Sequence, residues 1–324
     1  MKRGLIIGIT GQDGSYLTEE LLARGLEVHG TCRPSDLEDP ARLWRLAPVL
    51  DRVTLHPINL ANHASVSRLV ADLAPSSCFH LAGTRKPVAG PAEASGLLEG
   101  AIGTTHVILQ ALCDSPGASL VFAASSEMYG PDAPAPQDEG TPLDPRELYG
   151  IAKAAGFQLV RHYRETKGLR ASSAILFNHE SPRRGPEFVT RRISQAVARI
   201  KLGLQREVRL GDLDAQRDWG HARSYARGLA LMAELEEPRD FVLATGVLHS
   251  VREFLEEAFR HVGLDPRQHV ILDATLPRSL RGPLSGNPLL ARNVLGWQDE
   301  VAFGSLVAEM VDADLQRESQ QKHG

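Results

Sequence analysis

The stretch "GITGQDGSYL", residues 8–17, follows a short apolar run and opens a helical pattern. Its glycines, Gly8, Gly11 and Gly14, recur at every third position. Glycine allows a tight strand-to-helix turn and a close approach of the backbone to a pyrophosphate, which then faces the N–H groups of the helix N-terminus. The spacing is G-x-x-G-x-x-G rather than G-x-G-x-x-G. The strand–turn–helix context nevertheless favours a dinucleotide site over a turn that binds nothing.

Strand-like and helical patterns alternate through the first half of the chain. Short apolar runs predict strands at residues 5–9, 27–32, 53–60, 78–82, 120–124 and 171–177. Helical spacing predicts helices at residues 93–112, 149–165, 189–202, 251–262 and 303–315, and the tail "RESQQKHG" is predicted to fray. The alternation predicts an α/β fold with a doubly wound parallel, Rossmann-type sheet. We assign residues 1–178 to the dinucleotide-binding domain and 179–324 mainly to a smaller substrate-binding lobe, with part of 207–250 returning to the first domain.

The bulk composition is that of a soluble globular protein. The chain has 324 residues, of which 42% are hydrophobic and 23% charged, and 36 basic against 40 acidic residues give a net charge of −4. This balance argues against nucleic acid or a membrane surface as a main partner, and no apolar run is expected to cross a bilayer. Cys32, Cys78 and Cys113 lack metal-ligand spacing, so we expect reduced packing residues in a cytoplasmic protein and no metal site.

The end of the second strand, "GTCRPSD" at residues 30–36, bears on the choice of cofactor. NAD sites place a carboxylate there for the ribose hydroxyls, whereas a guanidinium can pair with the 2′-phosphate of NADP. Arg33 and Ser35 occupy this region and favour NADP. Asp36 keeps NAD open as the alternative, and Arg33 could instead be a solvated surface charge.

Polar groups with catalytic potential gather after the fifth strand. That strand ends in "AASSEMYG", residues 123–130, and "YGIAK", residues 149–153, follows it. Tyr149 and Lys153 share one face of a helix, where the ammonium stabilises a phenolate and lets Tyr149 act as a base. Ser125 supplies a hydroxyl for the reacting oxygen. The alternative is a surface tyrosine and lysine on an ordinary helix.

Glu127 narrows the chemistry further. An alcohol–ketone redox site needs the tyrosine, the lysine and a hydroxyl, whereas Glu127 adds a second base. It can remove the proton alpha to a ketone that hydride transfer has created. The alternative is a solvated or salt-bridged carboxylate.

Together these segments resemble the extended short-chain dehydrogenase/reductase family and, within it, the GDP-mannose 4,6-dehydratases. The resemblance covers nearly the whole chain and is carried by "GITGQDGSYL", "SSEMYG", "YGIAK", "ILFNHESPRRGPEFVTRRI", "LGDLDAQRDWGHA" and "FVLATGVLHSVREF". It implies a lyase that oxidises C4 of a nucleotide sugar with NADP, removes the C5 proton through Glu127, loses water from C6 and returns the hydride to C6. GDP-mannose is then the expected substrate and GDP-4-keto-6-deoxymannose the expected product.

The resemblance also implies roles by position. The catalytic residues are Ser125, Glu127, Tyr149 and Lys153. The cofactor-binding residues are Gly8, Gly11, Gln12, Asp13, Gly14, Arg33, Ser35, Asn59, Leu60, Leu81, Tyr149, Lys153 and His179. The substrate-binding residues are Ser126, Asn178, Glu180, Val189, Arg192, Arg217 and Arg278. The family packs the helices at 93–112 and 149–165 into a subunit interface, so a homodimer or homotetramer is expected; small or apolar residues that suit either that contact or the core are Ala101, Leu109, Ala152 and Ala155.

Three places depart from the family's pattern. Residues 82–90, "AGTRKPVAG", put Arg85 and Lys86 where small polar groups are usual, and residues 276–284, "LPRSLRGPL", lack the glutamate partner of a ribose. Asn59 replaces an acidic residue but can still accept a hydrogen bond from the adenine amine. These departures leave open a dehydratase for another nucleotide sugar, a 4-keto sugar nucleotide reductase or epimerase that needs no second base, and a cofactor-binding protein without catalysis.

Overall fold

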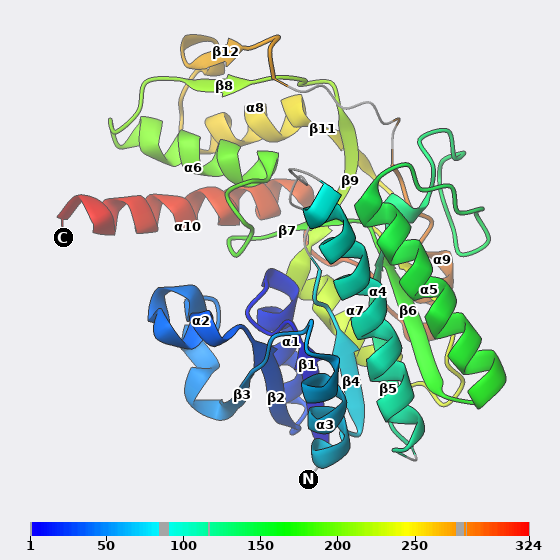
Figure 1. Cartoon of the computed structure of the whole chain (residues 1–324). Helices are drawn as coiled ribbons and strands as arrows, with labels where there is room; N and C mark the ends of the chain where they lie inside the picture. Colours follow the sequence, from blue (N-terminus) through cyan, green and yellow to red (C-terminus); the bar gives the residue numbers. More distant parts are fainter. Residues whose placement is uncertain (1, 84–90, 116, 277–281, 283, 324) are drawn as a thin grey trace.

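A parallel β-sheet forms the centre of the structure, a computed structural model that describes residues 2–83, 91–115, 117–276, 282 and 284–323 (Figure 1). The order of its seven described strands is β10-β6-β5-β4-β1-β2-β3, and every neighbouring pair is parallel. The strands are β1 (Arg3–Ile7), β2 (Glu27–Cys32), β3 (Val53–Pro57), β4 (Ser77–His80), β5 (Ser119–Ser125), β6 (Arg170–Leu176) and β10 (Phe241–Leu243). The predicted doubly wound α/β fold is confirmed, and its topological switch point lies between β1 and β4.

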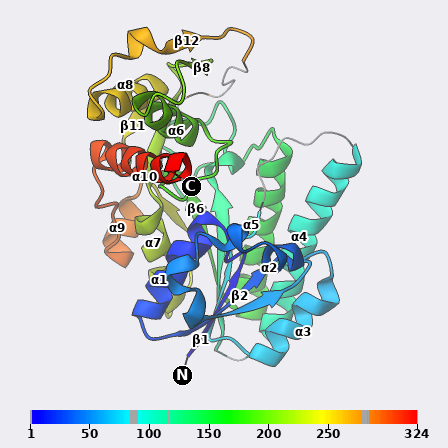
Figure 2. The ribbon, with the colours of Figure 1, turned by 90° about the vertical axis from the view of Figure 1, so that its left-hand side faces the viewer.

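Successive residues of the strands face two opposite layers of helices (Figure 2). Leu5 and Ile7 of β1 pack into the core beneath one layer, and Ile6 packs into the core beneath the other. The first layer holds α3 (His63–Leu73), α4 (Pro91–Cys113) and α5 (Leu148–Lys167); the second holds α1 (Gln12–Ala23) and α7 (Ala222–Glu234). Because both faces of the sheet are covered by helices, its carboxyl edge remains as the place for a site.

A second lobe lies beyond the carboxyl edge of the sheet (Figure 1). Its helices α6 (Val189–Lys201), α8 (Val251–His261) and α10 (Phe303–His323) enclose their own core, which includes Ile193, Phe254 and Met310. Its strands are β7 (Asn178–Glu180), β9 (Gln216–His221) and β11 (Leu248–Ser250) in one small sheet, and β8 (Val208–Leu210) and β12 (Val270–Leu272) in another. The lobe therefore stands opposite the loops that carry the glycine turn and the end of β5.

The C-terminal tail is helical rather than frayed, so that prediction is wrong. α10 continues to His323. Glu318 is buried, its carboxylate lies 2.8 Å from the Arg199 guanidinium, and it accepts a hydrogen bond from Gln195 Nε2 at 2.9 Å. This anchoring to α6 extends the helix past the residues that the apolar pattern marks.

Helix α4 corrects the expectation that no apolar run is long enough to cross a bilayer. Its segment Ala94–Cys113 has a mean hydropathy of 1.2 and is, by length and composition alone, long and apolar enough to cross a membrane. In the structure the helix packs between α3 and α5, and Ile108, Leu109 and Leu112 are buried in the core. Ala152 of α5 is also buried at 4% exposure, so core packing explains Leu109 and Ala152.

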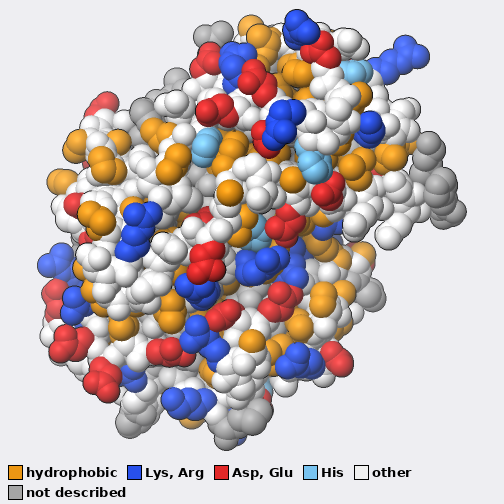
Figure 3. All heavy atoms as spheres, turned by 180° about the vertical axis from the view of Figure 1, so that it is seen from behind, with side chains coloured by type: hydrophobic (Ala, Val, Ile, Leu, Met, Phe, Trp, Pro, Cys, Tyr) orange, Lys and Arg blue, Asp and Glu red, His pale blue; other side chains and the backbone are white. Residues whose placement is uncertain are grey.

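Acidic and basic side chains are interspersed on the face opposite to that of Figure 1 (Figure 3). Ion pairs also join charged side chains elsewhere in the sequence: Arg24 lies 2.7 Å from Glu20 and 2.6 Å from Glu234. Such alternation does not build the continuous positive field that nucleic-acid binding requires on this face.

Candidate active site

The glycine turn joins β1 to α1 without side chains in the way of a ligand. Gly8 has a φ of +96°, and a Cβ on it would lie 3.0 Å from the Ala82 nitrogen. Gly11 is the N-cap of α1, and its N–H donates to the Gly8 carbonyl at 3.3 Å. Gly14 is buried, and a Cβ there would lie 2.5 Å from that same carbonyl. The turn therefore presents backbone N–H groups to a phosphate, while Gly14 allows the close packing behind them.

A cleft of about 1180 Å³ runs along the carboxyl edge of the sheet from this turn to α5. Its length, past the ends of β2 and β4, suits an extended dinucleotide. The predicted cofactor and catalytic residues that line it are Gly8, Gly11, Arg33, Ser35, Asn59, Leu60, Leu81, Tyr149 and Lys153. The structure thus brings residues from five separate segments to one groove.

At the end of β2, Asp36 is engaged within its own helix α2 (Pro34–Glu38). Its Oδ2 accepts a hydrogen bond from the Arg33 backbone N–H at 3.0 Å, and its Oδ1 lies 3.7 Å from the Arg42 guanidinium. The residue is only 6% exposed. Arg33 and Ser35 are exposed and line the cleft. Glu38, which is also exposed, lines this end of the cleft as well, so the exposed polar groups here include a cation, a hydroxyl and a carboxylate, while the Asp36 carboxylate is engaged within the protein.

Asn59 lines the cleft, but its side-chain oxygen already accepts a hydrogen bond from the Ala61 N–H at 3.1 Å. Asn62 caps α3 by accepting from the Ser65 N–H at 3.2 Å. An adenine amine would have to share the Asn59 oxygen with this turn, so the adenine contact stays a prediction.

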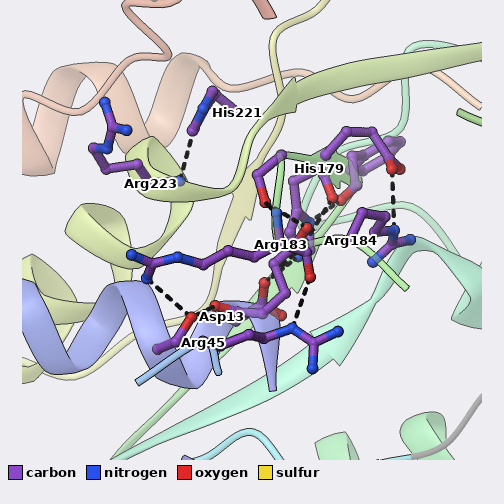
Figure 4. Close-up of polar contacts among 12 residues, drawn as sticks. Asp13, Arg45, His179, Arg183, Arg184, His221 and Arg223 are labelled. Carbon is purple, nitrogen blue, oxygen red and sulfur yellow. Dashed lines mark hydrogen bonds and ion pairs between the residues drawn. The ribbon is translucent and has the colours of Figure 1, made fainter. Parts of the chain in front are cut away.

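Gln12, Asp13 and His179 contact one another and are not among the residues lining the cleft (Figure 4). Asp13 Oδ1 lies 3.0 Å from His179 Nε2, and Gln12 Nε2 donates to the His179 carbonyl at 3.1 Å. Ser181 Oγ donates to Gln12 Oε1 at 2.8 Å. We predicted cofactor contacts for these three residues, whereas their side chains join the glycine turn to β7 of the second lobe.

The Asp13–His179 contact is an ion pair with matched pKa shifts. Burial would raise the pKa of Asp13, but His179 and Arg184 outweigh it and lower that pKa to about 2. Burial would lower the pKa of His179, but the Asp13 carboxylate outweighs it and raises that pKa above its ordinary value. Each group therefore favours the charged form of the other.

Tyr149 and Lys153 lie in the first two turns of α5. Lys153 is buried, its Nζ donates to the Ala123 carbonyl at 2.6 Å, and it lies 5.8 Å from the centre of the Tyr149 ring. Burial lowers the pKa of Lys153 to about 8, against an opposing effect of Asp13. The ammonium is thus charged at neutral pH and close enough to stabilise a Tyr149 phenolate.

Ser125, Ser126 and Glu127 end β5 and enter the short 3-10 helix η3 (Ser126–Met128). All three are buried, and the Glu127 N–H donates to Ser125 Oγ at 3.2 Å. Gly150, next to Tyr149, packs on the Glu127 main chain, where a Cβ would lie 2.3 Å from the Glu127 oxygen. A solvated carboxylate is excluded, because Glu127 is 7% exposed. The salt-bridged alternative stays open, and the role of Glu127 as a base stays a prediction.

His80, the last residue of β4, also lines the cleft and was missed by sequence reasoning. It is 2% exposed, and its Nε2 lies 3.1 Å from Thr105 Oγ1, while Nδ1 has no partner among the described residues. Burial, with Lys153 nearby, lowers the pKa of His80 to about 3, so the ring is neutral. Its place at the carboxyl end of a parallel strand was the available signal.

Glu180 holds the loop between β7 and α6 together. It is 1% exposed, its Oε2 accepts from Thr190 Oγ1 at 2.6 Å, and it lies 3.0 Å from Arg184 Nε. These contacts position the loop, and the direct substrate contact of Glu180 stays a prediction. Asn178 is half-buried at the start of β7, and Val189 is the first residue of α6.

Arg192 lies in a second, polar pocket of about 570 Å³ between α6 and β8. Its side chain donates to the Arg209 carbonyl at 3.2 Å, and Arg199 and Arg209 share the pocket wall. Arg199 and Arg209 already pair with Glu318 at 2.8 Å and Glu207 at 3.0 Å, so the contact of Arg192 with the nucleotide stays a prediction.

Asp218 anchors the "RDWG" segment and was also missed. It is fully buried and accepts hydrogen bonds from the N–H groups of Thr245 and Gly246, both at 2.8 Å, and of Gly286 at 3.2 Å. Arg217, its neighbour on β9, is half-buried. Asp218 therefore fixes the strand from which Arg217 extends.

The two most divergent segments lie largely outside the described residues. Arg85, Lys86 and Arg278 are among the positions not described. Leu284, at the end of the second segment, is buried and forms a β-bridge with Arg217. The described end of that segment thus leads directly to β9.

The glycine turn on a doubly wound sheet, with a Ser–Tyr–Lys set at its carboxyl edge and a lobe facing it, defines an extended short-chain dehydrogenase/reductase. The sequence profile of GDP-mannose 4,6 dehydratase matches residues 5–310. GDP-mannose 4,6 dehydratase 1 of Arabidopsis thaliana is 40% identical over 333 residues, which cover 99% of this chain and 92% of that protein. The chain therefore belongs to the GDP-mannose 4,6-dehydratase family, whose members are hydro-lyases.

Solved structures share the fold at lower identity. RMD from Pseudomonas aeruginosa, complexed with NADPH, has a TM-score of 0.82 and 21% identity, and the match covers 98% of this chain and 100% of that one. The dTDP-glucose 4,6-dehydratase of Bacillus anthracis, in complex with NAD, has a TM-score of 0.83 and 16% identity over 98% of both chains. Both confirm the fold class.

Proposed function

We propose that the chain converts GDP-mannose to GDP-4-keto-6-deoxymannose with a bound NADP that each turnover regenerates. The observation that carries the proposal is the position of the buried Glu127: its main-chain N–H donates to Ser125 Oγ, and its main-chain oxygen packs against Gly150 in the helix of Tyr149 and Lys153. An oxidoreductase of this class needs no such carboxylate, whereas elimination of water needs a second base. Identity of 40% to a GDP-mannose 4,6 dehydratase over 99% of the chain supports the same substrate.

Each side chain has one role in this reaction. Tyr149, as a phenolate stabilised by Lys153, accepts the proton of the sugar O4 hydroxyl, and Ser125 hydrogen-bonds that oxygen. The cleft lined by Gly8, Arg33 and Ser35 would hold NADP, which would supply hydride acceptance at C4 and hydride return at C6. Glu127 accepts the C5 proton, which the C4 ketone acidifies, and protonates the C6 hydroxyl as the C6–O bond breaks and water leaves. Tyr149 then gives its proton, after exchange with solvent, to C5 as the hydride returns to C6, and the phenolate is restored.

NADP rather than NAD is supported by the end of β2. The glycine turn has no room for a Cβ at Gly8 or Gly14. Beyond it, Arg33 and Ser35 line the cleft, and the only acidic group that kept NAD open, Asp36, caps α2. Because the compared structures hold either NADPH or NAD, the fold leaves the choice to these side chains. Stronger binding of NAD than of NADP would refute this assignment.

We also propose that two copies associate through α4 and α5 in a cytoplasmic homodimer or homotetramer. α4 is apolar along its length, yet only 35% of Ala94–Cys113 is buried within one chain, and Ile151 of α5 is 41% exposed. A second copy would cover such faces. All three cysteines are free, which agrees with a reducing compartment. Monomeric sedimentation would contradict the assembly.

The discriminating variant is Glu127→Gln. With GDP-mannose and NADP it should form reduced cofactor without losing water, because the first oxidation uses Tyr149 and Lys153 alone. Mass spectrometry of the sugar nucleotide and absorbance of the reduced nicotinamide read both steps. Glu165→Gln, on the exposed end of α5, is the matched control and should behave as the wild type. Unchanged water loss in Glu127→Gln would favour a different base or a reductase–epimerase reaction.

A further inference from the structure

Four arginines lie near one another: Arg45, which lines the dinucleotide cleft, and Arg183, Arg191 and Arg317 (Figure 4 shows Arg45 and Arg183). Three of them have a carboxylate in contact. Arg183 pairs with Glu19, while Arg191 and Arg317 lie 2.6 Å and 3.1 Å from Asp314.

Arg45 differs from these neighbours. Within the described part of the chain it forms no ion pair with a carboxylate, and its one hydrogen bond is from Nε to the Arg183 carbonyl at 2.8 Å. Burial and repulsion by the three other guanidinium groups lower the pKa of Arg45, with Glu187 opposing part of that effect. A bound anion would therefore stabilise the charged form of Arg45.

The terminal nitrogens of Arg45 are placed to meet such an anion. Arg45 lines the same cleft as Arg33 and Ser35, and its guanidinium lies 4.6 Å from the ring centre of Trp44. The Nε bond to Arg183 fixes the orientation of the group, and its two terminal amino groups donate to no acceptor among the described residues. Arg42, by contrast, lies within 3.7 Å of Asp36 and 3.4 Å of Asp39, so its charge is already offset.

We propose that Arg45 binds the 2′-phosphate of the cofactor together with Arg33, and so sets the preference for NADP over NAD. A phosphate monoester carries nearly two negative charges, and Arg33 and Arg45 are the two cations without a carboxylate contact that the described residues place at this end of the cleft. The inference rests on the proposed use of NADP and adds a residue from outside the β2–α2 turn. The loop that follows β7 then contributes to cofactor selectivity through the Arg183 carbonyl.

The test measures dissociation constants after removal of endogenous nucleotide. The probes are NADP against NAD, and adenosine 2′,5′-bisphosphate against 5′-AMP. Arg45→Met should weaken NADP and the bisphosphate roughly 10- to 100-fold, the loss expected for a charge-assisted hydrogen bond, and leave NAD and 5′-AMP unchanged. Arg45→Gln keeps a donor for the Arg183 carbonyl without the charge and should show the same selective loss if the Met variant folds poorly.

Arg239→Met is the control for loss of one surface charge and should change none of the four constants. Unchanged NADP binding in both Arg45 variants, or equal weakening of NADP and NAD, would overturn the role of Arg45. If the wild type binds the bisphosphate no better than 5′-AMP, the assignment of NADP as the cofactor is wrong. This result differs from a failure of the Arg45 role alone, in which the wild type prefers the bisphosphate and the Arg45 variants keep that preference.

Discussion

Gly150 of α5 lies so close to the main chain of Glu127 that a Cβ on Gly150 would be 2.3 Å from the Glu127 carbonyl oxygen. This contact sets the spacing between the helix that carries Tyr149 and the loop that carries the proposed second base. The glycine is required here by close approach, since its φ is not in the left-handed region.

Gly150→Ala should therefore displace α5 from η3. Overpacking of this kind costs about 1–3 kcal/mol of stability, and we expect kcat to fall more than 10-fold with a smaller change in KM. Steady-state kinetics together with thermal unfolding measure both effects. Gly140→Ala, where the nearest atom to a Cβ is 3.5 Å away, is the control. Wild-type kcat in Gly150→Ala would show that the spacing is not critical.

Asp13→Asn should destabilise the fold in a limited pH range. The pKa of Asp13 is lowered from 3.8 to about 2, so its contribution is complete above pH 3.8 and disappears as the pH falls through about 2. The raised pKa of His179 adds stability that is complete below pH 6.5 and is lost as the pH rises through its folded value. The difference from the wild type should be largest between these limits, about 2 kcal/mol. Denaturant unfolding at several pH values measures it, with exposed Asp72→Asn as control; a difference independent of pH would contradict the ion pair.

Lys153 should set an alkaline limit to catalysis. Its pKa of about 8 means that the stabilising ammonium is present below pH 8 and is lost above it. We expect kcat/KM of the wild type to decline above about pH 8, and Lys153→Met to lose at least 100-fold in kcat at neutral pH. The pH profile of kcat/KM tests this, and Lys167→Met at the far end of the same helix should keep the wild-type profile. A rate that keeps rising well past pH 8 would argue against the role.

Asp218→Asn should act on substrate binding through Arg217. Loss of the carboxylate leaves three backbone N–H groups with a weaker acceptor, at a cost of about 1–3 kcal/mol. Because β9 then loosens, KM for the sugar nucleotide should rise several-fold more than kcat falls. Kinetics with saturating cofactor distinguish the two parameters, and Asp214→Asn, at an exposed side chain, is the control. A fall in kcat of several-fold, with KM unchanged, would show that Arg217 lies outside the substrate site.

Several strands of the central sheet, such as β1 and β5, were predictable because they are short, largely apolar runs that are buried. β2 was predicted with its observed bounds, and β5 within one residue at each end. The glycine turn was equally readable, since Gly8, Gly11 and Gly14 serve a local geometry. Such features depend on neighbours in the chain, which a sequence pattern records directly.

Contacts between distant segments were not predictable in the same way. Gln12 and Asp13 contact His179, and Arg45 contacts Arg183, across more than a hundred residues. Position in a motif predicts ligand contacts for Asp13 and Glu180. In the structure Asp13 pairs with His179 and Glu180 pairs with Arg184. A local sequence pattern identifies the chemical type of a side chain, whereas its contacts with distant residues depend on the fold.

Turnover of GDP-mannose in D₂O, followed by mass spectrometry of the product, tests directly whether a base removes the C5 proton and water is lost. Loss of one water lowers the mass by about 18 units, and protonation of C5 from solvent adds one deuterium, about 1 unit, if a base has removed the C5 proton. We expect the wild-type product to show both the loss of water and the gain of one deuterium, with no net reduced cofactor. We expect Glu127→Gln to show neither mass change. A product of unchanged mass, or one that loses water without solvent deuterium, would contradict the proposed elimination.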